Sequence, residues 1–182
     1  AITSSGDIFK IQSDNGTIIW SRNAAESLYA NATDFFRSSE IVIDNDQLYF
    51  SAENNFYSYD VNNGNTNWKA NLHSIGTPIV SKNNIFVMTS NGYLVFIEKS
   101  TGEIVFSKNI LKVLKRKKRE TKITGFILGS GKIYSMTLNG YLIVTSATTG
   151  KTEFFKKIGQ PNISPLMISN GKLYILTSGS KI

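Results

Sequence analysis

The stretch KSTGEIVFSKN at residues 99–109 places a turn glycine, Gly102, four residues before a large aromatic side chain, Phe106. Recurrence of such a pattern along a chain indicates a repeated structural unit. The same spacing recurs in SDNGTIIW, VNNGNTNW and ATTGKTEFF, in the pairs Gly16–Trp20, Gly64–Trp68 and Gly150–Phe154.

The repeated unit extends to the N-terminal side of this pattern. A short apolar strand precedes the glycine, as in SNGYLVFI and LNGYLIV, and another strand precedes that one, as in DQLYFSA and GKIYSMTL. Turn positions between these two strands are spaced by 48, 38, 48 and 39 residues, at Gly6, Asn54, Gly92, Gly140 and Gly179. Repeats of about 40 to 50 residues with four short strands each are typical of propeller blades.

We therefore predict an all-β fold, a β-propeller built from four-stranded antiparallel blades. About four blades are expected, as part of a larger ring of about seven or eight. We expect residues 1–182 to be one repeat region and a fragment of a longer polypeptide, because the sequence opens inside a strand. The expected repeats are roughly 1–36, 37–74, 75–122, 123–161 and, in part, 162–182.

Composition narrows the possible chemistry. The sequence has no cysteine, which excludes disulfides, thiolate metal sites and cysteine nucleophiles. His73 is the single histidine, and no Ser-His-Asp or histidine-rich grouping accompanies it, so we interpret it as a surface or connector residue. No paired carboxylates stand at the spacing that a calcium site requires. We expect no catalytic residue, no metal site and no cofactor.

The turn-plus-aromatic pattern resembles the quinoprotein-type (PQQ-like) repeat, whose consensus is Ala-x-Asp-x-x-Thr-Gly-x-x-x-Trp. The segment YSYDVNNGNTNW keeps the acid, the glycine and the tryptophan as Asp60, Gly64 and Trp68. The segment VFIEKSTGEIVF has Glu98 at the acid position and Phe106 at the tryptophan position. VTSATTGKTEFF and FKIQSDNGTIIW depart further, with serine and glutamine in place of the acid. The match covers essentially the whole chain.

Sheet packing gives a structural interpretation of the repeated aromatics. One twisted sheet cannot bury both faces alone, and a wide ring on the outer strand fills the gap to the next sheet. Glycine permits the positive φ that the turn requires, and we expect Asp60 and Glu98 to cap the turn backbone. The predicted blade-docking core residues are Gly16, Trp20, Gly64, Trp68, Gly102, Phe106, Gly150 and Phe154.

Families with this repeat differ in function. The quinoprotein dehydrogenases hold pyrroloquinoline quinone and calcium, and the carboxylate ligands that a resemblance to them would imply are not evident here. The non-enzymatic branch includes the BamB-type outer-membrane assembly lipoproteins and the lumenal sensor domains of unfolded-protein kinases. The inner hairpins and the closing GKLYILTS are most similar to the C-terminal half of the BamB-type proteins.

That resemblance implies a non-catalytic scaffold for protein–protein interaction, periplasmic and associated with the outer membrane. Its implied partners are periplasmic domains of the outer-membrane β-barrel assembly machinery. A fragment of a PQQ-dependent dehydrogenase and a lumenal stress-sensor domain remain alternatives.

A basic segment, KVLKRKKRE at residues 112–120, contributes +5 to a formal net charge of +7. We interpret the rest of the chain as nearly neutral. The segment lacks interleaved aromatic side chains, which argues against nucleic-acid binding. An acidic partner surface or anionic lipid headgroups would suit it, and a solvated connector is the alternative. The candidate partner-binding residues are Lys112, Lys115, Arg116, Lys117, Lys118 and Arg119.

The basic segment lies in one of two long connectors, which run from Ser21 to Phe36 and from Phe106 to Ile123. Both join an outer strand to the next blade, so we expect them on the same propeller face. The apolar residues at the start of NILKVLKRKK predict one helical turn docked on the blade edge.

Overall fold

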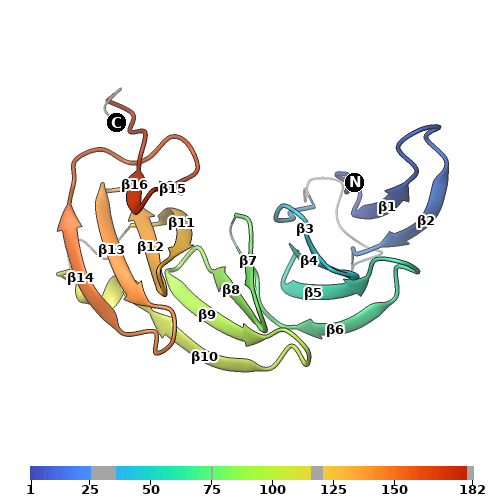
Figure 1. Ribbon diagram of the computed structural model, residues 1–182, viewed down its shortest axis with the longest axis horizontal. Helices are drawn as coiled ribbons and strands as arrows, with labels where there is room; N and C mark the ends of the chain where they lie inside the picture. The colour runs from blue at the N-terminus through green and yellow to red at the C-terminus, as the bar shows by residue number, and fades with distance from the viewer. Residues whose placement is uncertain (26–35, 75, 116–120, 180–182) are drawn as a thin grey trace. The chain divides into compact units, whose positions relative to one another are not determined.

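The computed structural model describes residues 1–25, 36–74, 76–115 and 121–179, and its regular elements are short β-strands and one 3-10 helical turn (Figure 1). The chain divides into two compact units. Unit 1 comprises Ala1–Ile85 and Glu98–Glu103, and unit 2 comprises Phe86–Ile97 and Ile104–Ile182. Among the described residues, no helical segment has the length and hydrophobicity needed to cross a membrane.

The strands form antiparallel meanders in which each strand pairs with its neighbours in the chain. A two-stranded sheet contains β1 (Asp7–Ile11) and β2 (Ile18–Asn23). The next sheet contains β3 (Val42–Asp44), β4 (Gln47–Ala52), β5 (Asn55–Asp60) and β6 (Thr66–Ala70). The third contains β7 (Ile79–Ser81), β8 (Asn84–Met88), β9 (Tyr93–Glu98) and β10 (Ile104–Asn109).

After β10 the chain forms the 3-10 turn η1 (Ile110–Val113). The fourth sheet contains β11 (Ile123–Gly129), β12 (Lys132–Thr137), β13 (Tyr141–Ser146) and β14 (Thr152–Lys157). The last sheet pairs β15 (Met167–Ser169) with β16 (Lys172–Tyr174). The prediction of an all-β chain with four-stranded antiparallel sheets is confirmed.

Each four-stranded sheet buries its second and third strands and exposes its fourth. In β4 and β5 nearly every residue is buried, which explains why QLYFSA and NFYSY carry apolar or small side chains at consecutive positions. The outer strands β6, β10 and β14 are mostly exposed. The outer strands therefore carry the side chains that are available for contacts with other molecules.

The turn between the first two strands of a sheet shares one backbone feature in four repeats. Two residues connect the strands, and the first of them has a φ near +50° although it is not glycine. Two-residue hairpins favour positive φ because it matches the twist of the flanking strands. The residues with this conformation are Asn45, Lys82, Ser130 and Asn170.

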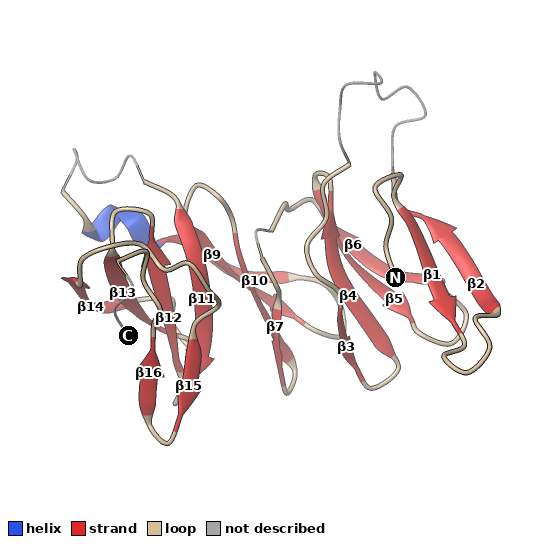
Figure 2. Cartoon of the chain, turned by 90° about the horizontal axis from the view of Figure 1, so that it is seen from above, coloured by secondary structure: helices blue, strands red, loops and turns tan. Residues whose placement is uncertain are grey.

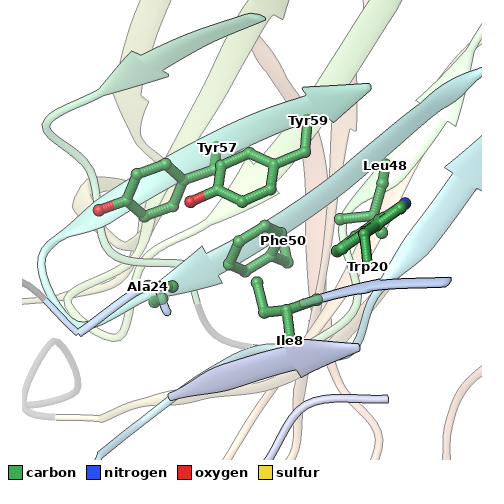
Figure 3. Packing of buried hydrophobic residues seen from close by; sticks show 8 residues of the cluster. Ile8, Trp20, Ala24, Leu48, Phe50, Tyr57 and Tyr59 are labelled. Carbon is green, nitrogen blue, oxygen red and sulfur yellow. The ribbon is translucent and has the colours of Figure 1, made fainter. Parts of the chain in front are cut away.

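Unit 1 has an aromatic core between β1 and the sheet of β4 and β5 (Figure 3). The Phe50 ring stacks on Tyr57 at 5.3 Å between ring centroids and meets Tyr59 edge-on at 5.2 Å. Figure 3 shows Ile8 pointing toward Phe50 from the side opposite the two tyrosines. Large side chains on one sheet thus meet a smaller apolar side chain on its neighbour.

Candidate interaction surfaces

In unit 1 each tryptophan of the repeat contacts the following repeat. Trp20 Nε1 donates a hydrogen bond to the Val61 carbonyl oxygen at 2.9 Å, and Trp68 Nε1 donates to the Lys99 carbonyl oxygen at 3.0 Å. A Cβ placed on Gly64 would lie 2.7 Å from the Trp20 ring. The equivalent distance from Gly102 to the Trp68 ring is 2.5 Å. The ring of one repeat thus occupies the space that the next repeat's glycine leaves empty.

Unit 2 repeats this contact with a phenylalanine. A Cβ on Gly150 would lie 2.7 Å from the Phe106 ring. Phe106 also stacks on Phe96, with 5.1 Å between ring centroids and an interplanar angle of 11°. The phenylalanine side chain has no N–H group, so this junction lacks the side-chain hydrogen bond that the tryptophans donate.

Two residues of the predicted docking set, Phe154 and Gly16, do not take part in a contact between a ring and a turn glycine. Phe154 is 50% exposed, which differs from the core position expected for it, and none of the described glycines has its ring among their nearest atoms. A Cβ on Gly16 would have nothing within 4 Å, although the φ of Gly16 is +74°. Gly16 therefore serves the turn alone.

The acid position of the repeat has different partners in different turns. Asp60 Oδ1 accepts hydrogen bonds from the backbone N–H groups of Asn62 and Asn63, at 2.7 and 3.1 Å, as expected for a turn cap. Glu98 instead accepts from the hydroxyls of Ser100 and Thr101, at 3.0 and 3.2 Å. The longer glutamate side chain carries its carboxylate past the backbone amides, so the backbone cap expected for Glu98 is not present.

Two carboxylates in the described part of the chain form ion pairs with lysines. Asp44 and Lys99 form an ion pair at 2.6 Å that joins two repeats of unit 1. Glu153 pairs with Lys132 across the fourth sheet, and its carboxylate raises the pKa of Lys132. Among the described residues no three His, Cys, Asp or Glu side chains come together as metal ligands. His73 lies partly buried in the connector after β6.

The start of the basic segment is anchored to unit 2. Asn109 Oδ1 accepts a hydrogen bond from Leu111 N at 3.0 Å, which caps η1. Leu111 fills the space above Gly92, where a Cβ would lie 2.5 Å from its side chain. Ile110 and Leu114 are also buried, and Figure 2 shows η1 in blue close to β14. The predicted helical turn on the blade edge is confirmed.

The basic residues themselves are only partly described. Lys112 and Lys115 are exposed. Arg116, Lys117, Lys118 and Arg119 lie outside the described residues, as does most of the other long connector, residues 26–35. A common face for the two connectors therefore stays a prediction.

The charge distribution shows a feature that the sequence interpretation missed. Unit 2 contains fourteen of the twenty basic residues but two of the thirteen acidic ones, a formal net charge of +12. Unit 1 has six basic and eleven acidic residues, a net charge of −5. The chain outside the basic segment is therefore strongly divided rather than nearly neutral. Counting charges by repeat would have shown this from the sequence.

Comparison with known proteins gives two kinds of finding. Residues 1–108 match the family model of the outer membrane protein assembly factor BamB. No curated protein matches the chain in sequence. The three solved structures described next are each less than 25% identical to it in sequence, so they inform on the fold alone.

Three of these structures illustrate the likeness. BamB from Moraxella catarrhalis has a TM-score of 0.67 and 17% identity, covering 90% of this chain and 50% of that one. The Cps50 (Swd1) β-propeller domain from Myceliophteria thermophila has a TM-score of 0.71 and 8% identity, covering 96% and 57%. Quinohemoprotein alcohol dehydrogenase from Comamonas testosteroni has a TM-score of 0.55 and 19% identity, covering 65% and 20%. The fold is a β-propeller fold, and the chain spans about half the length of the M. catarrhalis protein.

Proposed function

The chain belongs to the family of the outer membrane protein assembly factor BamB, and from that premise we propose that it is a non-catalytic scaffold in the assembly of outer-membrane β-barrel proteins. The observation that carries the proposal is the family match over residues 1–108. The proposal places the protein in the periplasm, in association with the outer membrane. It includes neither a quinone nor a calcium ion.

The structure offers surfaces that suit a scaffold. The second and third strands of each complete sheet are committed to packing, while the outer strands are exposed. The connector that carries the basic segment begins at η1, where three apolar residues are buried. The described basic residues of this segment, Lys112 and Lys115, are exposed.

We assign partner binding to the basic segment from Lys112 to Arg119. Its charge suits an acidic face on a periplasmic domain of the assembly machinery. Charges at the rim of an interface accelerate association by attracting the partner over distance, and salt weakens this attraction. The segment is therefore expected to act mainly on the rate of association.

The test is association kinetics with the periplasmic domains of the barrel-assembly core protein at two ionic strengths. The test variant changes Lys115, Arg116, Lys117, Lys118 and Arg119 to uncharged residues together. It should associate more slowly at low salt and lose most of the salt dependence, with an unchanged unfolding transition. A control neutralises four basic residues of unit 1, at Lys10, Arg37, Lys69 and Lys82, and leaves the ion pair of Lys99 with Asp44 intact.

The result separates the possible roles of the segment. Equal association rates for the test variant and the unaltered protein would show that the segment is a solvated connector. Binding to anionic vesicles in place of the protein domains, lost in the same variant, would assign the charges to a lipid surface. Failure of the unaltered protein to bind any of the domains would contradict the scaffold role itself.

A further inference from the structure

The outer edge of β14 combines a free strand edge with a concentration of positive charge. β14 is the terminal strand in the order β11-β12-β13-β14, so its outer edge has no strand partner among the described residues. All its residues except Thr152 are exposed. We call the β14 edge surface the set of Lys108, Lys151, Phe155, Lys156 and Lys157.

Two contacts within unit 2 show where lysine side chains of this surface lie. The Lys108 side chain lies over the turn that leads into β14, since a Cβ on Gly150 would be 2.7 Å from Lys108 Cγ. Lys157 Nζ lies 5.9 Å from the centre of the Tyr141 ring. The single acid of the strand, Glu153, is paired with Lys132 and does not offset the other lysines.

An exposed aromatic side chain lies among these lysines. Phe155 is 44% exposed and its ring centroid is 6.5 Å from that of Tyr141. The other outer strands have serine or lysine at the equivalent position, at Ser21, Lys69 and Ser107. β14 thus combines an exposed aromatic side chain, Phe155, with several lysines.

We propose that the β14 edge surface binds an extended acidic segment of a partner protein, which pairs with β14 as an added strand. An unpaired strand edge offers backbone N–H and C=O groups that only another extended backbone can satisfy in register. Lysines on an edge discourage pairing with neutral or basic strands, and the same charge favours an acidic one. The residues of unit 2 outside the basic segment, eight lysines and one glutamate, have a formal charge of +7 that attracts such a segment.

This inference is independent of the role proposed for the basic segment, because the two involve different residues. A lipid surface is the other anionic partner to consider. Its headgroups would respond to the charge, but they have no backbone to pair with the edge of β14. Protection of the β14 amides therefore distinguishes the two.

The experiment uses a fluorescent ten-residue peptide of alternating glutamate and valine, and a second peptide with lysine in place of each glutamate. Anisotropy should show binding of the acidic peptide alone. Amide hydrogen exchange should slow along Thr152–Lys157 when that peptide is bound. In the K156E/K157E variant the affinity should fall by about tenfold or more, because two attractive charges become repulsive.

The control variant K10E/K82E makes the same change of charge in unit 1 and should keep nearly all of the affinity. Equal losses in both variants would mean that net charge alone attracts the peptide, which contradicts a site at β14. Binding without slower exchange at β14 would also contradict the proposal. So would co-sedimentation with phosphatidylglycerol vesicles, lost in K156E/K157E, when the acidic peptide does not bind.

Discussion

At the scale of single residues, the repeated glycine has two separate physical roles. The first, positive φ in a turn, could be predicted from the sequence because the glycine recurs in turn-like contexts. The second could not, because it depends on a side chain from the preceding repeat. Only the packed structure places the Trp68 ring 2.5 Å from where a Gly102 Cβ would be.

Two alanine substitutions should separate these roles. Gly16→Ala strains the backbone alone and should cost about 1 to 2 kcal/mol of unfolding free energy. Gly102→Ala has a similar φ of +77° but also forces a methyl group into the Trp68 ring. Overpacking adds about 1 to 3 kcal/mol. Chemical denaturation of both variants measures the difference, and equal losses would show that the ring moves aside without cost.

The Trp68 side chain should stabilise the folded protein through the space that it fills more than through its N–H group. Trp68→Ala should lower the unfolding free energy by about 3 to 5 kcal/mol, as for other large aromatic side chains in packed sites. Trp68→Phe keeps a ring but loses the hydrogen bond to the Lys99 carbonyl, which is worth about 1 kcal/mol. An unchanged denaturation midpoint in Trp68→Ala would contradict the docking role.

At the scale of elements, strand identity was more predictable than strand exposure. Apolar and β-branched runs between turn residues predicted the strands because buried strands need such side chains. The exposure of Phe154 did not follow from the same pattern, since Trp20, Trp68 and Phe106 stand at equivalent places and lie at junctions. Exposure depends on what packs against the strand, and residue types along one strand do not encode that.

The hairpin between β11 and β12 gives a prediction at this scale. Ser130 has a φ of +49° and precedes Gly131, which has a φ of +71°. Asparagine tolerates positive φ better than serine, and Asn-Gly is the favoured pair for such turns. Ser130→Asn should therefore stabilise the protein by part of the about 1 to 2 kcal/mol that left-handed backbone costs an ordinary L-residue. Ser130→Val should destabilise it, and thermal unfolding of the pair checks the sign of each change.

At the scale of the whole molecule, charge separates the two compact units more sharply than their strand content does. Both consist of antiparallel sheets, yet their formal charges are −5 and +12. The basic segment was found from sequence because its charges are consecutive. The other lysines of unit 2 are dispersed along β10, β12, β14, β16 and the segments of sequence next to them, and they are recognised as one group only once they are assigned to the same compact unit.

This division should be measurable by ion exchange. Retention on a cation exchanger depends on the local density of positive charge as well as on net charge. K156E/K157E should elute at lower salt than K10E/K82E, although the two variants have equal net charge. Identical elution would show that the lysines of unit 2 do not act as one surface.

The junction between a ring and the next repeat's glycine also bears on how such chains change length during evolution. The ring belongs to one repeat. The glycine that it covers belongs to the repeat that follows, as does the carbonyl group that accepts the hydrogen bond of each tryptophan. Duplicating one whole repeat therefore adds a ring and a glycine together and leaves every older junction complete. Insertions within a connector are also tolerated, since the ring and its glycine are 44 residues apart in Trp20–Gly64 and 34 residues apart in Trp68–Gly102. Duplication of whole repeats and lengthening of connectors are thus two paths of growth that leave this packing intact.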